Sequence, residues 1–350
     1  MDLASVLFYD DLVNLLEIST LTTLSKKLSQ KVNWKILIQT HLSKRKYYFL
    51  SLGNDYNRLK PKELETYARY YEVQHSDKFG KLGRRLESFP AVDDWRYTRV
   101  VGIRVRSVFF TECSAECFDF ITAEVLKALP FLDLESQCQL WWRNGFFTPD
   151  QESSIVELLG KAPFTRLCFE NDSQVRAFAP HLATHGRLQY MNLEYGCLPT
   201  GDKKVISMLE AVIKQPQYQK LILKHNGDDD RTSLEMFRMC VEKWLQDEEF
   251  LFYVVARVEG VKSELAKLLK QFHEKDGVTH FARRHSVDSN NYVLAKCEEK
   301  KQRGTIVTMC SLKKGRKFND FPIGIDVRHP MHKPPRATMK VIFNGDDFVL

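Results

Sequence analysis

The sequence lacks most of the local motifs by which enzymes are recognised. It contains no Gly-x-Ser-x-Gly turn, no Gly-x4-Gly-Lys-Ser/Thr phosphate loop, and no Gly-x-Gly-x-x-Gly after a strand pattern. Only 16 of its 350 residues are Gly, so a glycine-rich phosphate cradle is not expected. The sequence therefore predicts a protein that catalyses no reaction and holds no cofactor.

Long apolar runs are also missing. No uninterrupted apolar stretch approaches the roughly 20 residues needed to cross a bilayer, and Asp10 and Asp11 arrive too early for a secretory leader. The eight cysteines form no Cys-x-x-Cys pair, and most lie in apolar stretches, which favours reduced, buried thiols. We expect a protein of the cytosol or nucleus without a membrane partner.

Charge of one sign is only mildly in excess. The chain has 52 Lys and Arg against 45 Asp and Glu, a net charge of +7, which does not by itself indicate nucleic acid. A hydrophobic content of 43% is enough for one large or two moderate cores.

Three short helical patterns are present in residues 3–44. Such helices are marginal alone, because nucleation is costly and each buries one stripe of side chains. We therefore expect them to pack together and to leave apolar side chains for a partner. The apolar positions are Phe8, Leu12, Leu15 and Leu16, then Leu21, Leu24 and Leu28, then Trp34, Leu37, Ile38 and His41.

Residues 46–100 are less regular and are predicted to be a connecting segment. A helix is expected to begin at Lys60–Glu65, where Pro61 would lie in the first turn. The stretch Phe79–Trp95 contains Gly80, Gly83 and Pro90, which is typical of a loop.

Between residues 101 and 275, short strand patterns alternate with amphipathic helices. This alternation predicts parallel βα units and hence an α/β fold, with a leucine-rich-repeat-like platform as the more specific hypothesis. The predicted strands are Val105–Thr111, Cys138–Trp142, Thr165–Glu170, Leu188–Tyr195, Tyr218–Lys224 and Leu251–Val258. The predicted helices lie near 114–129, 150–160, 173–184, 202–214, 233–246 and 261–273.

Residues 276–350 show strand patterns without helical ones. Their short, turn-prone connections predict a small antiparallel β cap. The predicted organisation is thus a helical module at 1–45, a connecting segment at 46–100, a βα platform at 101–275 and the cap at 276–350. The cap strands are Tyr292–Cys297, Thr305–Leu312, Ile323–Val327 and Thr338–Phe343.

Metal ligands are considered at a few positions. Cys113 and Cys117, four apart after a strand, could meet on one helix face, but zinc sites usually show paired spacing in both halves. Buried structural cysteines and surface histidines are the preferred interpretation. Asn226–Asp230 has calcium-ligand types but lacks the loop length and distal Glu of an EF-hand. The additional histidines considered are His280 with His285 and His329 with His332.

Two further stretches leave alternatives open. Lys296–Lys317 contains eight Lys and Arg against two Glu, and could clamp a nucleic-acid strand, although most of these charges fall in turns that water would solvate. Trp141 and Trp142 point to opposite faces of a predicted strand. One of them could anchor a ligand, or both could pack inside.

The N-terminal pattern resembles an F-box. The resemblance rests on the apolar helix Phe8–Leu16, on Leu21-x-x-Leu24 and Leu28-Ser29, and on Trp34. The whole chain is similar to the large nematode family of F-box proteins with a divergent C-terminal region. The turn Arg328-His329-Pro330 and the strand Met339–Phe343 match the end of that family. Where an F-box usually opens with Leu-Pro, this sequence has Ala4-Ser5-Val6-Leu7 and no Pro.

The resemblance implies a substrate receptor of a cullin-type ubiquitin ligase. The helical module would dock on a Skp-family adaptor, and the platform would hold a protein target through residues that the sequence does not identify. The alternatives are an interaction scaffold without a ubiquitin role, a nucleic-acid-binding protein that uses the basic C-terminal sheet, and an enzyme of unrecognised type. The candidate adaptor-binding residues are Phe8, Leu12, Leu15, Leu16, Leu21, Leu24 and Trp34.

Overall fold

The computed structural model divides the chain into two compact units, residues 1–167 and 168–350. The residues that it describes are 12–13, 16, 18–27, 32–56, 64–73, 82–86, 88, 96–107, 113–133, 138–143, 147–169, 172–182, 186–193, 203–225, 230–275, 278–288, 290–300, 304–313, 342–344 and 347–349.

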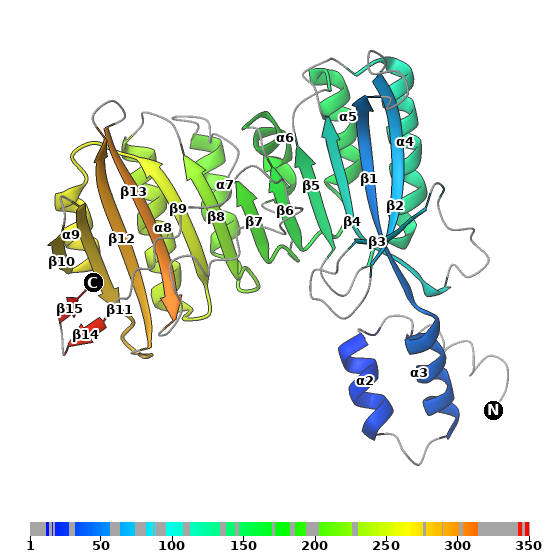
Figure 1. Ribbon diagram of the computed structural model, residues 1–350, viewed down its shortest axis with the longest axis horizontal. Helices are drawn as coiled ribbons and strands as arrows, with labels where there is room; N and C mark the ends of the chain where they lie inside the picture. The colour runs from blue at the N-terminus through cyan, green and yellow to red at the C-terminus, as the bar shows by residue number, and fades with distance from the viewer. Residues whose placement is uncertain are drawn as a thin grey trace. The chain divides into compact units, whose positions relative to one another are not determined.

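The first unit begins with the predicted helical segment. Helices α2 (Ile18–Lys27) and α3 (Val32–Lys44) pack against each other, and α3 leads into the first strand through the single residue Arg45 (Figure 1). Of the first predicted helix, only residues 12, 13 and 16 are described. The second and third helical patterns are thus confirmed as helices.

The sheet of the first unit contains strands that the sequence did not reveal. Its order is β5-β4-β1-β2-β3, with β1 parallel to β4 and antiparallel to β2. Three of these strands lie in 46–100, so the prediction that this range is an irregular connecting segment was wrong. The prediction of a helix from residue 60 was also wrong, because β2 begins at Leu64. The strand bounds are β1 (Lys46–Tyr56), β2 (Leu64–Val73), β3 (Leu82–Leu86), β4 (Thr98–Ser107) and β5 (Gln139–Arg143).

Burial on both faces explains why β1 was missed. Its residues from 47 to 53 are all buried, so the alternation of polar and apolar residues that marks a half-exposed strand is absent. A strand buried on both faces has no periodic signal of its own. Its pairing with β4, some fifty residues later, is set by tertiary contacts and not by the local sequence.

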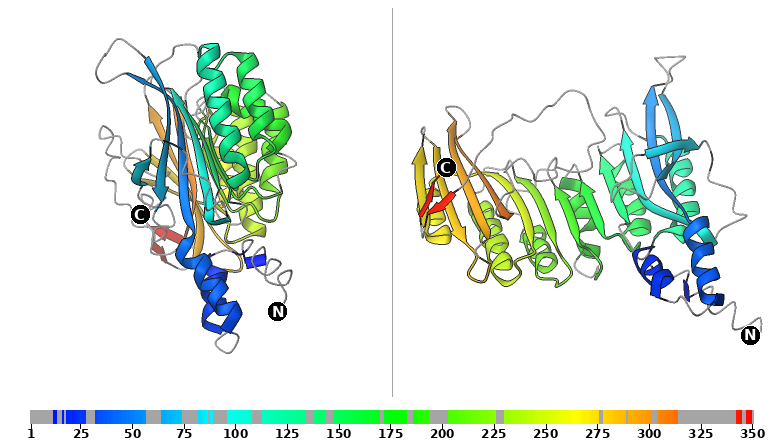
Figure 2. Two further views of the ribbon diagram at one scale, coloured as in Figure 1. Left: turned by 90° about the vertical axis from the view of Figure 1, so that its right-hand side faces the viewer. Right: turned by 60° about the horizontal axis from the view of Figure 1, so that its bottom comes forward.

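Helices α4 (Ala115–Ala128) and α5 (Pro149–Leu159) cover one face of this sheet (Figure 2). Ile121, Val125 and Ala128 form the buried stripe of α4 at helical spacing. The Tyr70 hydroxyl of β2 donates a 2.5 Å hydrogen bond to the Glu124 carboxylate, which fixes α4 against the sheet. The 3-10 turn Leu129–Phe131 follows α4.

The second unit confirms the predicted alternation of strands and helices. The strands β7, β8 and β9 pair in parallel and in sequence order, with helices on one face of the sheet (Figure 1). The α/β class is therefore correct. The bounds are β6 (Arg166–Phe169), α6 (Asp172–Leu182), β7 (Tyr190–Leu193), α7 (Lys203–Ile213), β8 (Lys220–His225), α8 (Asp230–Gln246), β9 (Leu251–Arg257) and α9 (Lys262–Leu269).

The C-terminal strands are antiparallel. They run in the order β10-β11-β12-β13, and β13 then pairs antiparallel with β9. The bounds are β10 (Gln271–Lys275), β11 (Val278–Arg284), β12 (Asn291–Lys300) and β13 (Gly304–Lys313), with the separate pair β14 (Ile342–Asn344) and β15 (Asp347–Val349).

The predicted helix near 261–273 ends earlier than expected. Lys270 adopts a left-handed backbone with φ 71°, which stops α9 at Leu269 and lets β10 begin at once. Neither β10 nor β11 was predicted as a strand. The predicted strand Ile323–Val327 lies outside the described residues.

Candidate interaction surface

A very small core holds the N-terminal helices together. Val13, Leu21 and Ile38 are fully buried, and they are the only described core residues of this segment. Three buried side chains cannot also shelter the remaining apolar positions of two short helices. The half-buried residues packed around this core are Leu16, Leu24, Trp34, Leu37 and Leu42.

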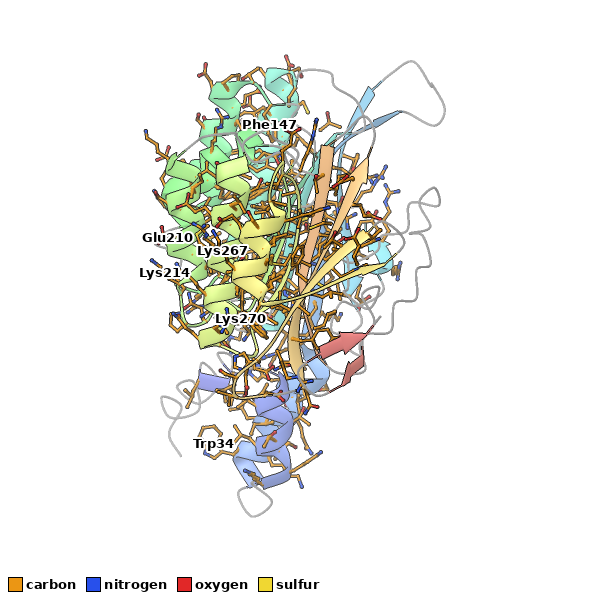
Figure 3. All side chains as sticks on the ribbon, turned by 90° about the vertical axis from the view of Figure 1, so that its left-hand side faces the viewer. Trp34, Phe147, Glu210, Lys214, Lys267 and Lys270 are labelled. Atoms are coloured by element: carbon orange, nitrogen blue, oxygen red, sulfur yellow. The ribbon has the colours of Figure 1, made fainter. Side chains whose placement is uncertain are left out.

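Two apolar side chains of this segment keep a large exposed fraction. Ile36 of α3 is 57% exposed and Leu12 is 39% exposed. Trp34 is half-buried and lies at the outer edge of the helical segment (Figure 3). Together with the half-buried leucines, they leave an apolar area on helices that are too small to enclose it. This area, formed by Leu12, Leu16, Leu24 and Trp34, is called the apolar patch; Ile36 lies on the side of α3 opposite to the buried Ile38 and is not part of it.

The surroundings of the apolar patch are basic. Neither α2 nor α3 contains an acidic residue. Lys26, Lys27 and Lys44 are exposed, and Lys35 is half-buried. On α2 and α3, basic side chains thus border the apolar ones, which favours a partner with acidic groups facing these two helices.

Arg45 ties the helices to the chain that precedes them. Its guanidinium donates to the carbonyl of Leu16 at 2.5 Å and to the carbonyl of Val13 at 2.6 Å. These are carbonyls of the segment that precedes α2, and Arg45 is itself 9% exposed. One buried cation thus holds in place the segment that carries Leu12 and Leu16.

Tyr97 contacts the end of α3. The buried His41 ring meets the Tyr97 ring edge-on at 5.0 Å, and the Lys44 ammonium lies 5.2 Å from the centroid of the same ring. These contacts, with the direct entry into β1, fix the C-terminal end of α3.

The structure divides the predicted adaptor-binding residues. Leu21 is fully buried and belongs to the core, so its side chain is not on the surface. Leu12, Leu16, Leu24 and Trp34 keep exposed area, while Phe8 and Leu15 lie outside the described residues. Ile36 was missed because it falls off the apolar stripe of α3, and an exposed position gives no periodic signal.

The candidate metal ligands lie in different surroundings. Cys113 is buried and precedes the N-cap of α4, whereas Cys117 is half-buried in the first turn, so the two do not lie on one helix face. His285 is a structural residue: its Nδ1 accepts from the backbone N–H of Val287 and Asp288, and its Nε2 faces the Trp244 carbonyl at 3.2 Å. Within the described ranges, no three His, Cys, Asp or Glu residues gather as a metal site would require.

Both tryptophans of β5 are buried, which settles the alternative left open by the sequence. Trp142 packs edge-on against Phe147 at 5.7 Å on the helix side. Trp141 lies on the other face, where the Arg104 guanidinium sits 4.9 Å from its ring centroid and 5.1 Å from the ring of Phe49. Neither tryptophan is an exposed anchor.

The basic C-terminal stretch is partly neutralised. The Lys296 ammonium lies 2.7 Å from Glu298, and Glu299 pairs with Lys262 of α9 at 2.9 Å. The remaining basic positions of the stretch lie outside the described residues or have undescribed side chains.

Comparison with known proteins gives no family for this chain. No family model matches the sequence, and no curated protein matches it. One solved structure, a chain provisionally assigned as a sugar kinase from Clostridium perfringens, aligns over 70% of this chain and 74% of its own length. Its identity is 7% and its TM-score 0.18, which carries no argument about fold or activity. Among the described helices, none has the length and apolar content of a membrane-crossing segment.

Proposed function

We propose that this protein is a substrate receptor that docks through its N-terminal helices on an adaptor of the Skp family and so joins a cullin-type ubiquitin ligase in the cytosol or nucleus. The observation that carries the proposal is the apolar patch. Burying apolar area yields roughly 25 cal/mol per Å², so an exposed patch on so small a segment favours a protein partner.

The charge of the helices defines the partner further. Because α2 and α3 have basic residues and no acidic ones, the proposed adaptor surface is acidic around an apolar groove. Exposed charges steer encounter and are screened by salt, with a Debye length of about 8 Å at physiological ionic strength. Association should therefore slow as salt is raised, while the apolar contacts limit dissociation.

The rest of the chain supplies the proposed platform. Within each unit, parallel strands are joined by helices that lie on one face of the sheet, which supports a leucine-rich-repeat-like reading. The platform would hold a protein target and raise its effective concentration near the ubiquitin-charged enzyme. In this proposal the chain itself makes no bond.

Exchange of the exposed apolar side chains tests the proposal. Leu12→Asp places a charge in the apolar patch, and Ile36→Asp places one on the exposed side of α3, without replacing a residue of the small core. We expect co-purification of a Skp-family adaptor to fall at least about tenfold, since 1.4 kcal/mol corresponds to tenfold and central apolar anchors contribute more than 1 kcal/mol each. The measurement is adaptor recovered per mole of tagged full-length protein.

Leu126→Asp is the matched control. Leu126 of α4 is 51% exposed and equally apolar, but it lies outside the N-terminal helices. Its exchange should leave adaptor recovery unchanged. Absence of adaptor from the unmodified protein, or equal loss in both variants, would reject the receptor proposal and leave the scaffold without a ubiquitin role.

A further inference from the structure

The face of the first sheet that lies opposite α4 and α5 carries four arginines (Figure 2). Successive side chains of a strand point to opposite faces. Tyr70 of β2 bonds to Glu124 of α4, so Arg69 next to it points away from the helices. The strand register places three further arginines on that face, namely Arg85 of β3 and Arg104 and Arg106 of β4. These four residues are called the arginine face.

Tyr67 of β2 fixes two of these guanidinium groups. The Arg69 guanidinium lies 4.0 Å from the centroid of the Tyr67 ring, and Arg106 Nε donates a 2.9 Å hydrogen bond to the Tyr67 hydroxyl. Arg106 and Tyr67 belong to strands on either side of β1, where Gly53 pairs with both of them. A Cβ at Gly53 would lie 3.4 Å from the Tyr67 hydroxyl oxygen and would collide with the Arg106 carbonyl. The missing side chain thus lets the contact cross β1.

Two other rings hold the guanidinium of Arg104. It lies 5.1 Å from the ring centroid of Phe49 and 4.9 Å from that of Trp141, which come from the strands on either side of β4. Both distances are within the range of an attractive cation–π contact. A planar guanidinium that is already positioned loses less conformational freedom when it binds an anion. The sheet therefore presents pre-positioned cations on this face.

The four arginines occupy three successive rows across the strands. Arg85 pairs with Tyr71 in the first row, and Arg69 and Arg104 both pair with Ser51 in the second. Arg106 lies in the third row, beside Gly53. Each row is two residues further along the strands, which corresponds to roughly 6.6 Å. Positive charge thus repeats at the spacing of alternate residues in an extended chain.

Part of the arginine face is open to solvent. Arg85 is exposed, and Arg69 and Arg106 are half-buried, whereas Arg104 is only 7% exposed. Among the described side chains that the strands place on this face, none is acidic. A surface with several positive charges and no negative one complements an anionic ligand.

The aromatic rings of this face favour a peptide over a nucleic acid. Single-stranded nucleic acids gain affinity by stacking their bases on exposed rings. Phe49, Tyr67 and Trp141 are all buried, and guanidinium groups already contact them. A carboxylate needs no ring, because it accepts two parallel hydrogen bonds from the edge of a guanidinium. In an extended peptide, acidic side chains at alternate positions share one face and repeat at roughly 6.6 Å.

We propose that the arginine face binds an extended acidic peptide segment, with Asp or Glu at alternate positions, in the protein target of the platform. The segment lies across the three rows, and its carboxylates accept hydrogen bonds from Arg69, Arg85 and Arg106. Arg104 adds to the positive field from below. Only the description of the ligand as a target rests on the proposed function, and the binding itself needs no adaptor.

Fluorescence anisotropy of a labelled peptide with the full-length protein tests the surface. The probe alternates Glu and Ser, and the comparison peptide has the same composition with its Glu residues in one block. The alternating peptide should bind more tightly, and its affinity should fall as salt is raised. Arg69→Gln with Arg106→Gln should weaken its binding at least about tenfold, since two charged hydrogen-bond donors are lost.

Lys214→Gln with Lys267→Gln is the matched control. These lysines are exposed on α7 and α9 (Figure 3), and their exchange changes the net charge by the same amount. Peptide affinity should change less than about twofold. Because Arg69 and Arg106 also contact Tyr67, Arg85→Gln provides a variant without that contact. It should weaken binding about threefold while the urea midpoint of unfolding stays unchanged.

Several outcomes would overturn the assignment. They are no binding of the alternating peptide, equal weakening in the arginine and lysine variants, or tighter binding of an oligothymidylate of the same charge that the arginine variants abolish. Adaptor recovery separates this inference from the proposed function. The arginine variants should recover as much adaptor as the unmodified protein, and a chain that binds the peptide but no adaptor would reject the receptor role alone.

Discussion

Arg45 is the residue that connects the apolar patch to the folded sheet. Its guanidinium satisfies two carbonyls of the segment before α2, and its backbone enters β1 one residue later. A hydrogen bond from a charged donor contributes about 1.5 to 3 kcal/mol, more than a neutral one. Arg45 and the core contact of Val13 therefore position the segment that carries Leu12 and Leu16.

We expect Arg45→Met to destabilise the protein by roughly 2 to 4 kcal/mol. Methionine keeps much of the aliphatic volume but leaves the carbonyls of Val13 and Leu16 without their donor. Urea unfolding followed by circular dichroism measures the change, and adaptor recovery should fall with it.

Arg84→Met serves as the control for Arg45. Arg84 of β3 is exposed, so its exchange should cost less than about 0.5 kcal/mol. Equal unfolding midpoints for the Arg45 and Arg84 variants would show that the two carbonyls find other donors.

At the scale of elements, the approach of β1 to β4 and β5 depends on a glycine. A Cβ added at Gly102 would lie 2.7 Å from the Phe49 ring and 2.6 Å from the Gln139 side chain. Phe49 of β1 pairs with Gly102 of β4, and Gly102 pairs with Gln139 of β5. The missing side chain is what allows three neighbouring strands to place Phe49 flat on this face.

Gly102→Ala should therefore cost about 1 to 3 kcal/mol, the usual penalty for overpacking. Adding Phe49→Leu should recover part of that loss, because the leucine side chain is smaller than the ring that the new methyl meets. Unfolding free energies of the two single variants and the double variant complete the cycle.

Gly186→Ala is the matched control for this exchange. A Cβ at Gly186 meets no atom within 4 Å, so its effect should be close to zero. Strictly additive effects of the Gly102 and Phe49 exchanges would contradict the proposed contact.

At the scale of the whole molecule, each unit contains a buried tyrosine that resists ionisation. Burial raises the pKa of Tyr47 in the first unit and of Tyr292 in the second, each to about 12. An unfolded tyrosine has a pKa of about 10, so above that pH the unfolded chain loses protons that the folded chain keeps. Stability is complete below pH 10 and is lost progressively between pH 10 and 12.

The unfolding free energy should fall by on the order of 2 kcal/mol per tyrosine over that interval. Urea titrations at a series of pH values measure the fall. Tyr292→Phe removes its share of the slope and leaves that of Tyr47. A slope that is the same in the variant and the unmodified protein would show that Tyr292 ionises freely in the folded state.

Periodicity in the sequence was enough to predict the alternating elements of the platform. The stripe of α7 and the alternation of β9 both survive in the fold, because each element has one buried face. Periodicity failed for β1, whose residues from 47 to 53 are all buried. It failed also at Lys270, where a left-handed residue other than glycine ends α9 without a sequence signal.

The sequence predicted that the N-terminal helices expose apolar area, but not which residues form it. Three short helical patterns with one apolar stripe each were expected to leave apolar area exposed, and that follows from their size alone. The sequence could not assign Leu21 to the core and Ile36 to the surface, since both are apolar residues in helical segments.

By itself, the sequence determined which stretches form helices or half-exposed strands, since these depend on spacing along the chain. Only the tertiary structure decided the pairing of β1 with β4, the burial of both tryptophans, and which leucines remain open to solvent. The reason is physical: spacing fixes which side chains share a face, but burial depends on what distant segments bring against that face.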